Sequence, residues 1–298
     1  MPGVSGKPWA RMSLGEFELI GKFFSRGSGR KDVVLGVGDD AALVRVPQGH
    51  ELVVAADTLV AGVHFPSGAD AYSIGYRALA VNLSDMAAMG AVPAWFTLAL
   101  TLPAADEGWL EAFSRGLLEL AVTHRVALIG GDTTSGPLTV TVSIMGLVPE
   151  GSAVRRSGAR VGDLVCVSGS VGEAAGGLAV LQGRVPAVNA LSEDKDHLRQ
   201  RFLRPEPRVE LGLRLRGTAS AAIDVSDGLY ADLGRLVAAS GCAARLDVDA
   251  LSLSAPLKRC FGDEVALRYA LAGGDDYELC FTVPPGRFEA LRQAAEGC

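Results

Sequence analysis

The chain has 298 residues, of which 49% are hydrophobic, and a formal net charge of -6 at pH 7. This length and composition predict a globular chain of one large domain or two ordinary ones with an ample core. The acidic balance disfavours a nucleic-acid partner, which would need a basic face, and the lack of a long apolar run or a signal peptide predicts a cytoplasmic protein without a membrane span.

The first part of the chain predicts a tail, a helix and three short strands. Residues 1–13 contain Pro and Gly without periodicity and are expected to form a mobile tail, whereas Glu16–Phe24 has the pattern of a short amphipathic helix. Strands are then predicted at Val33–Leu35, Ala42–Val46 and Leu52–Ala56. Asp40 would therefore lie in a loop between two strands, and Asp57 just beyond the end of the third.

Longer periodic segments follow. They predict helices and strands at Ala71–Met89, Trp95–Leu102, Glu107–His124, Val126–Ile129 and Leu138–Ile144. In the first helix Asn82 and Asp85 share a face, and a carboxylate on a largely apolar helix needs a partner such as a metal ion. The alternating strands Trp95–Leu102 and Leu138–Ile144 have two uncharged faces, which predicts that another sheet or subunit covers the second face.

A domain boundary is predicted at Val148–Gly151, which gives an N-terminal domain at 14–149 and a C-terminal domain at 150–298. The second domain should contain strands at Leu164–Ser168, Ala221–Val225, Ala244–Asp247 and Leu279–Val283, helices at Glu173–Leu181, Arg208–Leu215 and Leu229–Ala239, and a polar loop at Gly183–Asp196. This order of strands and helices predicts an α/β (α+β) fold class, with two mixed sheets covered by helices.

The chemistry centres on Gly36–Asp40, where two glycines and two adjacent carboxylates stand between hydrophobic residues. Glycines let backbone N–H groups approach an anion, and paired carboxylates repel each other unless a cation or donor lies between them. A hairpin turn would use the same residue types. Similar Gly-Asp or Ser-Asp elements recur, however, at Asp57-Thr58, Asn82–Asp85, Gly130–Thr133, Asp224–Gly228 and Gly273–Asp276. This repetition favours a site for a metal-bridged phosphate.

The candidate metal ligands are Asp40, Asp57, Asp85, Asp132, Asp224 and Asp227, with Asp275 further along the chain. Carboxylates gathered from distant loops suit Mg²⁺ with a nucleotide triphosphate, because Mg²⁺ is held by a few carboxylates together with water and phosphate oxygens. An EF-hand loop, a P-loop and the protein-kinase motifs are all absent from the sequence. The five cysteines lack a C-x-x-C pair and are interpreted as buried, reduced thiols.

These motifs resemble those of thiamine-monophosphate kinases. The resemblance is carried by Gly38–Ala42, Asp57–Phe65, Ala80–Gly90, Gly130–Thr134, Ile223–Leu229 and Gly273–Leu279, and it runs in order from about Gly15 to Val283. The wider superfamily includes aminoimidazole ribonucleotide synthetase and selenophosphate synthetase. It implies an N-terminal sheet that packs against the sheet of a dimer mate, a C-terminal α/β domain, and ATP at their junction.

The resemblance implies transfer of the γ-phosphate of ATP to thiamine monophosphate, giving thiamine diphosphate, by a homodimer that needs several Mg²⁺ ions. Another ATP-dependent synthetase of the same superfamily and a non-catalytic metal-nucleotide binding protein remain alternatives. A phosphate acceptor is already ionised near neutral pH, so neither a general base nor a covalent nucleophile is expected among the side chains.

The resemblance also assigns roles to single residues. Magnesium would be held by Asp40, Asp57, Asp85, Asp132, Asp224 and Asp227; ATP would be bound by Gly131, Asp132, Arg156 and Ser226; and the substrate would be bound by His64 and Asp275. Each role has a structural alternative. Asp227 could cap the following helix, Arg156 could be an exposed loop charge, and His64 could be a loop histidine with its own hydrogen bonds.

Two departures from the family pattern bear on the site. Ala55 and Ala56 replace the hydroxyl residues that commonly precede this aspartate, so a side-chain metal ligand is lost there. The family also continues beyond the position of Cys298 through a last strand and an aromatic residue that contacts thiamine. The resemblance therefore implies a truncated C-terminal end and weaker substrate binding.

Overall fold

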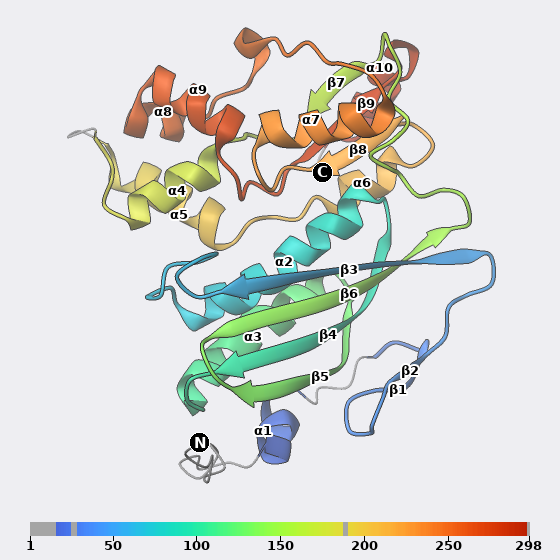
Figure 1. Ribbon diagram of the computed structural model, residues 1–298, viewed down its shortest axis with the longest axis vertical. Coiled ribbons are helices and arrows are strands. Elements are labelled where there is room, and N and C mark those ends of the chain that lie inside the picture. Colours follow the sequence, from blue (N-terminus) through green and yellow to red (C-terminus); the bar gives the residue numbers. More distant parts are fainter. Residues whose placement is uncertain (1–15, 25–28, 187–189, 297–298) are drawn as a thin grey trace, which may run out of the picture. The chain divides into compact units, whose positions relative to one another are not determined.

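The computed structural model describes residues 16–24, 29–186 and 190–296 (Figure 1). Contacts divide the chain into two compact units, each described by itself below. The first unit comprises residues up to 48 together with 54–82 and 93–145, and the second comprises 49–53, 83–92 and 146–298. The predicted tail at 1–13 lies outside the described residues.

The first unit is built on a four-stranded sheet with the strand order β3-β6-β4-β5. These strands are β3 (His50–Val60), β4 (Val92–Leu102), β5 (Ala127–Ser135) and β6 (Thr139–Pro149). β4 and β5 run parallel. Two short strands, β1 (Val33–Leu35) and β2 (Leu43–Val44), pair antiparallel and enclose the Gly-Asp loop, as the sequence predicts.

Three helices belong to this part of the chain: α1 (Glu16–Phe23), α2 (Ala71–Ala88) and α3 (Glu107–Thr123). The alternation predicted for β4 is confirmed, because Phe96, Leu98 and Leu100 are all buried. α3 packs against β5, and its Phe113 is fully buried. One face of the sheet therefore forms the core of the unit.

On β3 and β6, the other face of this sheet carries small, uncharged side chains. Along β3 the side chains of Val54, Ala56 and Thr58 are exposed in alternation, and Val54 retains 63% of its surface. The hydroxyls of Thr58 and Thr141 lie 2.9 Å apart across β3 and β6. The uncharged second face predicted for Leu138–Ile144 is thus observed on β6, whereas beside β4 the exposed Asp132 of β5, the register partner of Ala99, adds a charge.

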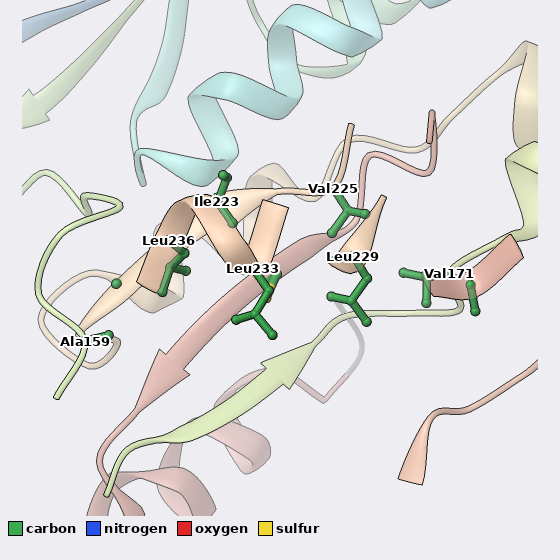
Figure 2. Close-up of a cluster of buried hydrophobic side chains, with 10 residues drawn as sticks. Ala159, Val171, Ile223, Val225, Leu229, Leu233 and Leu236 are labelled. Carbon is green, nitrogen blue, oxygen red and sulfur yellow. The ribbon is translucent and has the colours of Figure 1, made fainter. Parts of the chain in front are cut away.

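The second unit contains a three-stranded sheet, β7-β9-β8, formed by β7 (Leu164–Val167), β8 (Ala221–Asp224) and β9 (Leu279–Val283). Both pairings are antiparallel, so the described strands of this sheet are not mixed, contrary to the prediction. Helices and strands alternate along the chain, which confirms the α/β class. The core forms where Leu229, Leu233 and Leu236 of α7 pack near β8 (Figure 2).

The helices of the second unit are α4 (Glu173–Leu181), α5 (Ser192–Leu203), α6 (Val209–Leu215), α7 (Leu229–Ser240), η2 (Val248–Ala250), α8 (Ala255–Phe261), α9 (Asp263–Ala272) and α10 (Pro285–Ala294). The register of the sheet matters for the site. Val167 pairs with Cys280 and Asp224 with Leu279, so the ends of β7 and β8 and the start of β9 meet at one edge. Three loops therefore converge there.

Some predicted boundaries are wrong. The predicted strand Ala244–Asp247 has no regular secondary structure, and only one of its four residues, Leu246, is half-buried. The predicted polar loop Gly183–Asp196 gives way to α5 at Ser192, a helix whose polar sequence hides its period. Asp57 and Asp132 lie within β3 and β5 instead of after them, because ladder hydrogen bonding continues through both acidic segments.

Candidate active site

The acidic loop between β1 and β2 opens onto a cavity of the first unit. Gly38 has a φ of 121°, a conformation that favours glycine. The Asp39 carboxylate accepts the backbone N–H of Asp40 at 2.8 Å, and both side chains are exposed. Asp39, Asp40 and Asp132 line one cavity of about 640 Å³. The structure therefore brings Asp40, from the loop between β1 and β2, and Asp132, from within β5, to the same cavity.

A β-bulge gives Asp132 its place. Phe96 pairs with Leu128 but Thr97 pairs with Gly130, so Ile129 is the extra residue, and bulges of this kind re-aim the side chains that follow them. A Cβ on Gly131 would lie 1.9 Å from the Leu98 carbonyl oxygen, which excludes any larger residue. Asp132 is consequently exposed, whereas Thr133 is buried.

Asp57 and His64 lie on and just after β3. Asp57 is half-buried and shares its side of the strand with the buried Leu59. The exposed His64 accepts the backbone N–H of Val60 through its Nδ1 at 3.0 Å. This contact fixes the imidazole ring on its own loop and leaves Nε2 as the ring nitrogen available to another group.

In the second unit Asp224 is one of the predicted metal ligands. It is the last residue of β8, is 5% exposed, and its Oδ2 accepts the hydroxyl of the buried Ser84 at 2.9 Å. Asp85, the next residue along α2, is half-buried. The last turn of α2, which carries Asp85, therefore meets the end of β8. The sequence pattern gave no role to the Ser84 hydroxyl.

Asp232 organises the loop that follows β8. Its Oδ2 accepts the backbone N–H groups of Ser226 and Asp227 at 3.0 and 2.9 Å, while its Oδ1 accepts from Arg235. Asp227 itself makes no cap to α7 and instead forms an ion pair of 2.6 Å with Arg235. The structural alternative for Asp227 is thus not observed, and the loop before α7 is held by an aspartate within the helix that the motif analysis missed.

The Gly273–Glu278 loop runs beside the same segment. The backbone N–H of Asp275 donates to the Ser226 carbonyl at 2.9 Å, and a Cβ on Gly274 would come within 2.5 Å of that oxygen. Asp224, Ser226, Asp227 and Asp275 therefore gather at one edge of the β7-β9-β8 sheet.

Arg156 lies elsewhere in this unit. Its side chain is exposed, and its carbonyl accepts from the hydroxyl of Ser240, the last residue of α7, at 3.0 Å. A helix of this length spans roughly 18 Å, so the Arg156 backbone is separated from the Ser226–Asp227 loop by the length of α7.

The donor set fits Mg²⁺ chemically. The candidate ligands are carboxylates, and hard cations prefer oxygen ligands. Within residues 16–24, 29–186 and 190–296, no three His, Cys, Asp or Glu side chains cluster closely enough to hold a metal ion on their own. Mg²⁺ keeps several waters and takes substrate phosphates as ligands, so one or two carboxylates from a loop suffice.

No helix in the described part of the chain has the length and apolarity to cross a membrane.

Models of known protein families match both parts of the chain. The N-terminal domain of AIR synthase related proteins matches residues 38–148, and the C-terminal domain of the same proteins matches 160–298. Together the two matches span most of the chain. They define its class as a two-domain AIR synthase related protein.

Similarity to single relatives is more specific. Thiamine-monophosphate kinase of Salmonella typhimurium (strain LT2) is 56% identical over 276 residues, which cover 92% of this chain and 84% of the relative. The crystal structure of thiamine-monophosphate kinase from Stenotrophomonas maltophilia K279a has a TM-score of 0.88 and 53% identity, covering 95% and 90% of the two chains. The chain belongs to the thiamine-monophosphate kinase family.

A third relative carries ligands. AaThiL, solved in complex with AMPPCP and TMP, has a TM-score of 0.76 and 33% identity, covering 84% of this chain and 81% of that chain.

Proposed function

We propose that this protein transfers the γ-phosphate of ATP to thiamine monophosphate, giving thiamine diphosphate and ADP. The observation that carries the proposal is the similarity to AaThiL, whose structure holds AMPPCP and TMP. The acidic loops described above supply the residue types that such a reaction needs. Phosphoryl transfer depends on positioning and charge neutralisation more than on covalent chemistry.

Magnesium would be held by Asp40, Asp57 and Asp132 of the first unit and by Asp85, Asp224 and Asp227 of the second. When bound, the ions supply positive charge that offsets the repulsion between two phosphate groups. Two observations support the assignment: Asp40 and Asp132 line one cavity, and the Ser84 hydroxyl links the last turn of α2 to Asp224.

ATP would be bound by Gly131, Asp132, Arg156 and Ser226, and thiamine monophosphate by His64 and Asp275. The close approach of Gly131 to β4 leaves no room for a side chain at that position. The His64 ring is fixed by its contact with Val60. We retain 14–149 and 150–298 as the two functional domains, a division supported by the extent of the two domain matches.

The direct test is product formation. The purified chain, incubated with ATP, Mg²⁺ and thiamine monophosphate, should form thiamine diphosphate and ADP in equal amounts. Product from a different acceptor in a substrate screen would favour another ATP-dependent synthetase of the superfamily. Binding of ATP and Mg²⁺ without any turnover would favour a non-catalytic binding protein.

We further propose that transfer is direct, from ATP to the acceptor phosphate. A phosphoenzyme would need a nucleophile activated by a neighbouring base, and the candidate aspartates are assigned to metal binding. His64, the histidine at the site, uses Nδ1 to accept a backbone hydrogen bond. The acceptor phosphate can therefore act as its own nucleophile when held in line.

Stereochemistry tests this mechanism. A chirally labelled γ-thiophosphate should invert once on transfer to thiamine monophosphate. Net retention, or labelled protein trapped from ATP before the acceptor is added, would show that an enzyme-bound intermediate exists.

A further inference from the structure

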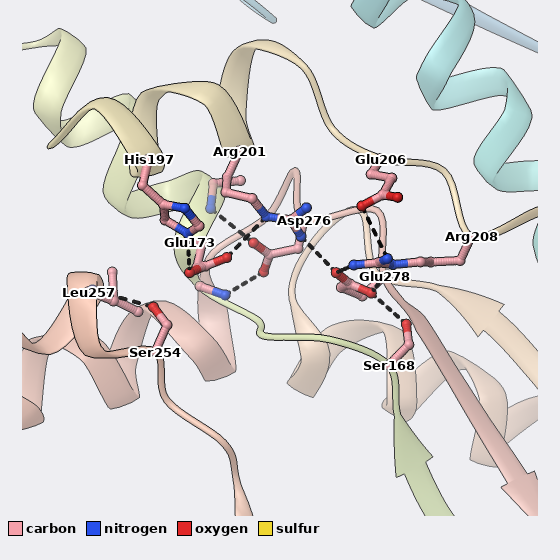
Figure 3. A network of polar contacts seen from close by, with 12 residues as sticks. Ser168, Glu173, His197, Arg201, Glu206, Arg208, Ser254, Leu257, Asp276 and Glu278 are labelled. Carbon is pink, nitrogen blue, oxygen red and sulfur yellow. Dashed lines mark hydrogen bonds and ion pairs between the residues drawn. The ribbon is translucent and has the colours of Figure 1, made fainter. Parts of the chain in front are cut away.

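A buried polar network holds Asp276 and Glu278 of the Gly273–Glu278 loop, the Asp275 loop (Figure 3). Its centre is Glu278, which is 0% exposed and immediately precedes β9. Arg208 holds the carboxylate with a fork of two hydrogen bonds, Nε to Oε2 at 2.8 Å and Nη2 to Oε1 at 2.7 Å. Arg201 adds a third at 2.7 Å, and the Ser168 hydroxyl a fourth at 2.5 Å. Bidentate pairs of this kind fix geometry as well as charge.

The network reaches three parts of the unit. Arg201 comes from α5 and also pairs with Glu173 at the start of α4, at 3.0 Å. Ser168 follows β7, and its hydroxyl accepts the backbone N–H of Leu279 at 2.8 Å. A Cβ on Gly169 would lie 2.3 Å from the Glu278 carboxylate. Contacts from several elements therefore fix the position of Glu278.

Asp276 forms a second anchor two residues earlier. It is 2% exposed, and its two carboxylate oxygens accept the backbone N–H groups of Gly172 and Ala174 at 2.5 and 3.0 Å. This contact joins the loop to the first turn of α4. Asp276 and Glu278 thus anchor two positions of the loop to the interior of the unit.

Tyr277 lies between these anchors and Asp275 immediately precedes the first of them, and the two residues share an uncommon backbone conformation. Their φ angles are 72° and 52°, the left-handed region that non-glycine residues rarely adopt. Such residues persist where the surrounding structure holds them, and they gather at ligand sites. Their N–H groups donate to the carbonyls of Ser226 and Val225, both at 2.9 Å.

The strained pair is also joined through its side chains. The hydroxyl of Tyr277, a residue only 8% exposed, donates to Oδ1 of Asp275 at 3.2 Å. Asp275 itself is half-buried. The direction of its carboxylate is consequently set by a tyrosine whose own backbone lies between the two buried anchors.

We propose that Glu278, clamped by Arg201 and Arg208, is a positioning residue for thiamine monophosphate: it fixes the backbone of Asp275–Tyr277 so that the Asp275 carboxylate meets the cationic thiazolium ring. This inference rests on the proposed function, which makes Asp275 a substrate contact. Glu278 itself is fully buried and acts through Asp275, so its effect should fall on the binding of thiamine monophosphate and not on that of ATP.

The test is a double-mutant cycle with calorimetric binding of thiamine monophosphate as its readout. Glu278→Gln keeps the shape of the side chain and removes its charge, and it should weaken binding about tenfold while changing the Kd for ATP less than about twofold. Asp275→Asn should weaken thiamine monophosphate binding at least as much. The double variant should bind no more weakly than Asp275→Asn alone, because the two residues act in series. Additive losses would overturn the proposal.

Asp194→Asn is the matched control. Asp194 is also a buried carboxylate of this unit, 2% exposed, and is held by Arg259 through two hydrogen bonds of 2.8 and 2.5 Å. It contacts α8 and not the Asp275 loop, so its loss should lower thermal stability without changing the Kd for thiamine monophosphate. An equal change in that Kd would show that general loosening explains the effect, and the proposal would fail.

A second variant keeps the test decisive if Glu278→Gln does not fold. Arg208→Lys retains the charge but lacks the fork, and it should give the same non-additive pattern with Asp275→Asn. Failure of the proposed function has a different signature. In that case the wild-type chain forms no thiamine diphosphate. If only the positioning role is wrong, the wild type is active and the losses of binding in the double-mutant cycle are additive.

Discussion

At the scale of single residues, the surroundings of two buried carboxylates shift their pKa values in opposite directions. Burial raises the pKa of Asp276 to about 7 from 3.8, although two backbone N–H groups and Arg201 act in the opposite direction. The nearby Glu278 adds to the rise. By contrast, hydrogen bonding from Arg259 lowers the pKa of Asp194. Burial therefore dominates at Asp276, whereas at Asp194 the hydrogen bonding from Arg259 outweighs it.

The raised pKa predicts a pH-dependent stability. The folded state binds a proton at Asp276 more tightly than the unfolded state does, so this contribution is complete below about pH 4 and is lost as the pH rises towards about 7. Urea unfolding of the wild type should therefore show that the free energy of unfolding falls as the pH rises over this window. In Asp276→Asn this fall should be smaller than in the wild type, by a few kcal/mol at most. Equal slopes in the two proteins would contradict the assignment.

Asp85 is expected to matter for turnover and little for folding. It lies in the last turn of α2, half-buried, next to the serine that contacts Asp224. Loss of one charge beside a polyphosphate and its ions should cost several kcal/mol in the transition state, so Asp85→Asn should reduce kcat about 100-fold or more. Asp196→Asn, which removes an exposed carboxylate paired with Arg199, is the control. Near-normal turnover of Asp85→Asn at saturating Mg²⁺ would rule the role out.

At the scale of elements, glycines set how closely α2 and α3 approach. A Cβ on Gly75 would lie 2.1 Å from the Phe113 carbonyl oxygen, and one on Gly116 would lie 2.1 Å from that of Tyr72. A glycine of each helix thus packs directly against the backbone of the other helix. The low intrinsic helix propensity of glycine is accepted here because a side chain would force the two helices apart.

This packing gives a matched pair of substitutions. Gly116→Ala should lower the free energy of unfolding by about 1–3 kcal/mol, because the added methyl group must displace backbone. Gly234→Ala, in the exposed part of α7 where nothing lies within 4 Å of the added Cβ, should be neutral or stabilise the protein by up to about 1 kcal/mol. Chemical denaturation of both variants measures the contrast. Equal effects would mean that the α2–α3 contact is looser than described.

At the scale of the whole molecule, we expect the protein to assemble through its first sheet. The exposed face formed by β3 and β6 carries Val54 at 63% exposure and hydroxyl side chains such as Thr58 and Thr141. An uncharged, partly apolar sheet face of this kind is typical of an interface between copies. Light scattering at micromolar concentration should give about twice the chain mass of 30.9 kDa.

A charge on that face should prevent assembly. Val54→Asp is predicted to give a monomer, because pairing of two copies would bury the new carboxylate without a partner. Val161→Asp is the control, since Val161 is 97% exposed in the second unit and should leave the dimer intact. A wild-type monomer, or a dimer in both variants, would contradict an interface at this face.

Periodic segments were predictable from the sequence because their signal is local. α2 and β4 begin and end within a few residues of their predicted bounds, since one buried face imposes its spacing on every turn or alternate residue. Ala244–Asp247 has strand-like composition but no neighbouring strand to complete its hydrogen bonds. α5, with the sequence SEDKDHLRQRFL, has so few apolar residues that its period is hard to read, although Leu198 and Phe202 are buried.

The sequence by itself determined the family resemblance and the acidic motifs, because both reside in short runs of neighbouring residues. Only the tertiary structure decided which groups meet. Ser84 and Asp224 are 140 residues apart, and Ser168 and Glu278 are 110 apart. Contacts of this kind depend on sheet register and helix packing, which short-range patterns do not encode. The left-handed backbone of Asp275 and Tyr277 likewise has no signal in residue type, since it depends on the buried anchors Asp276 and Glu278.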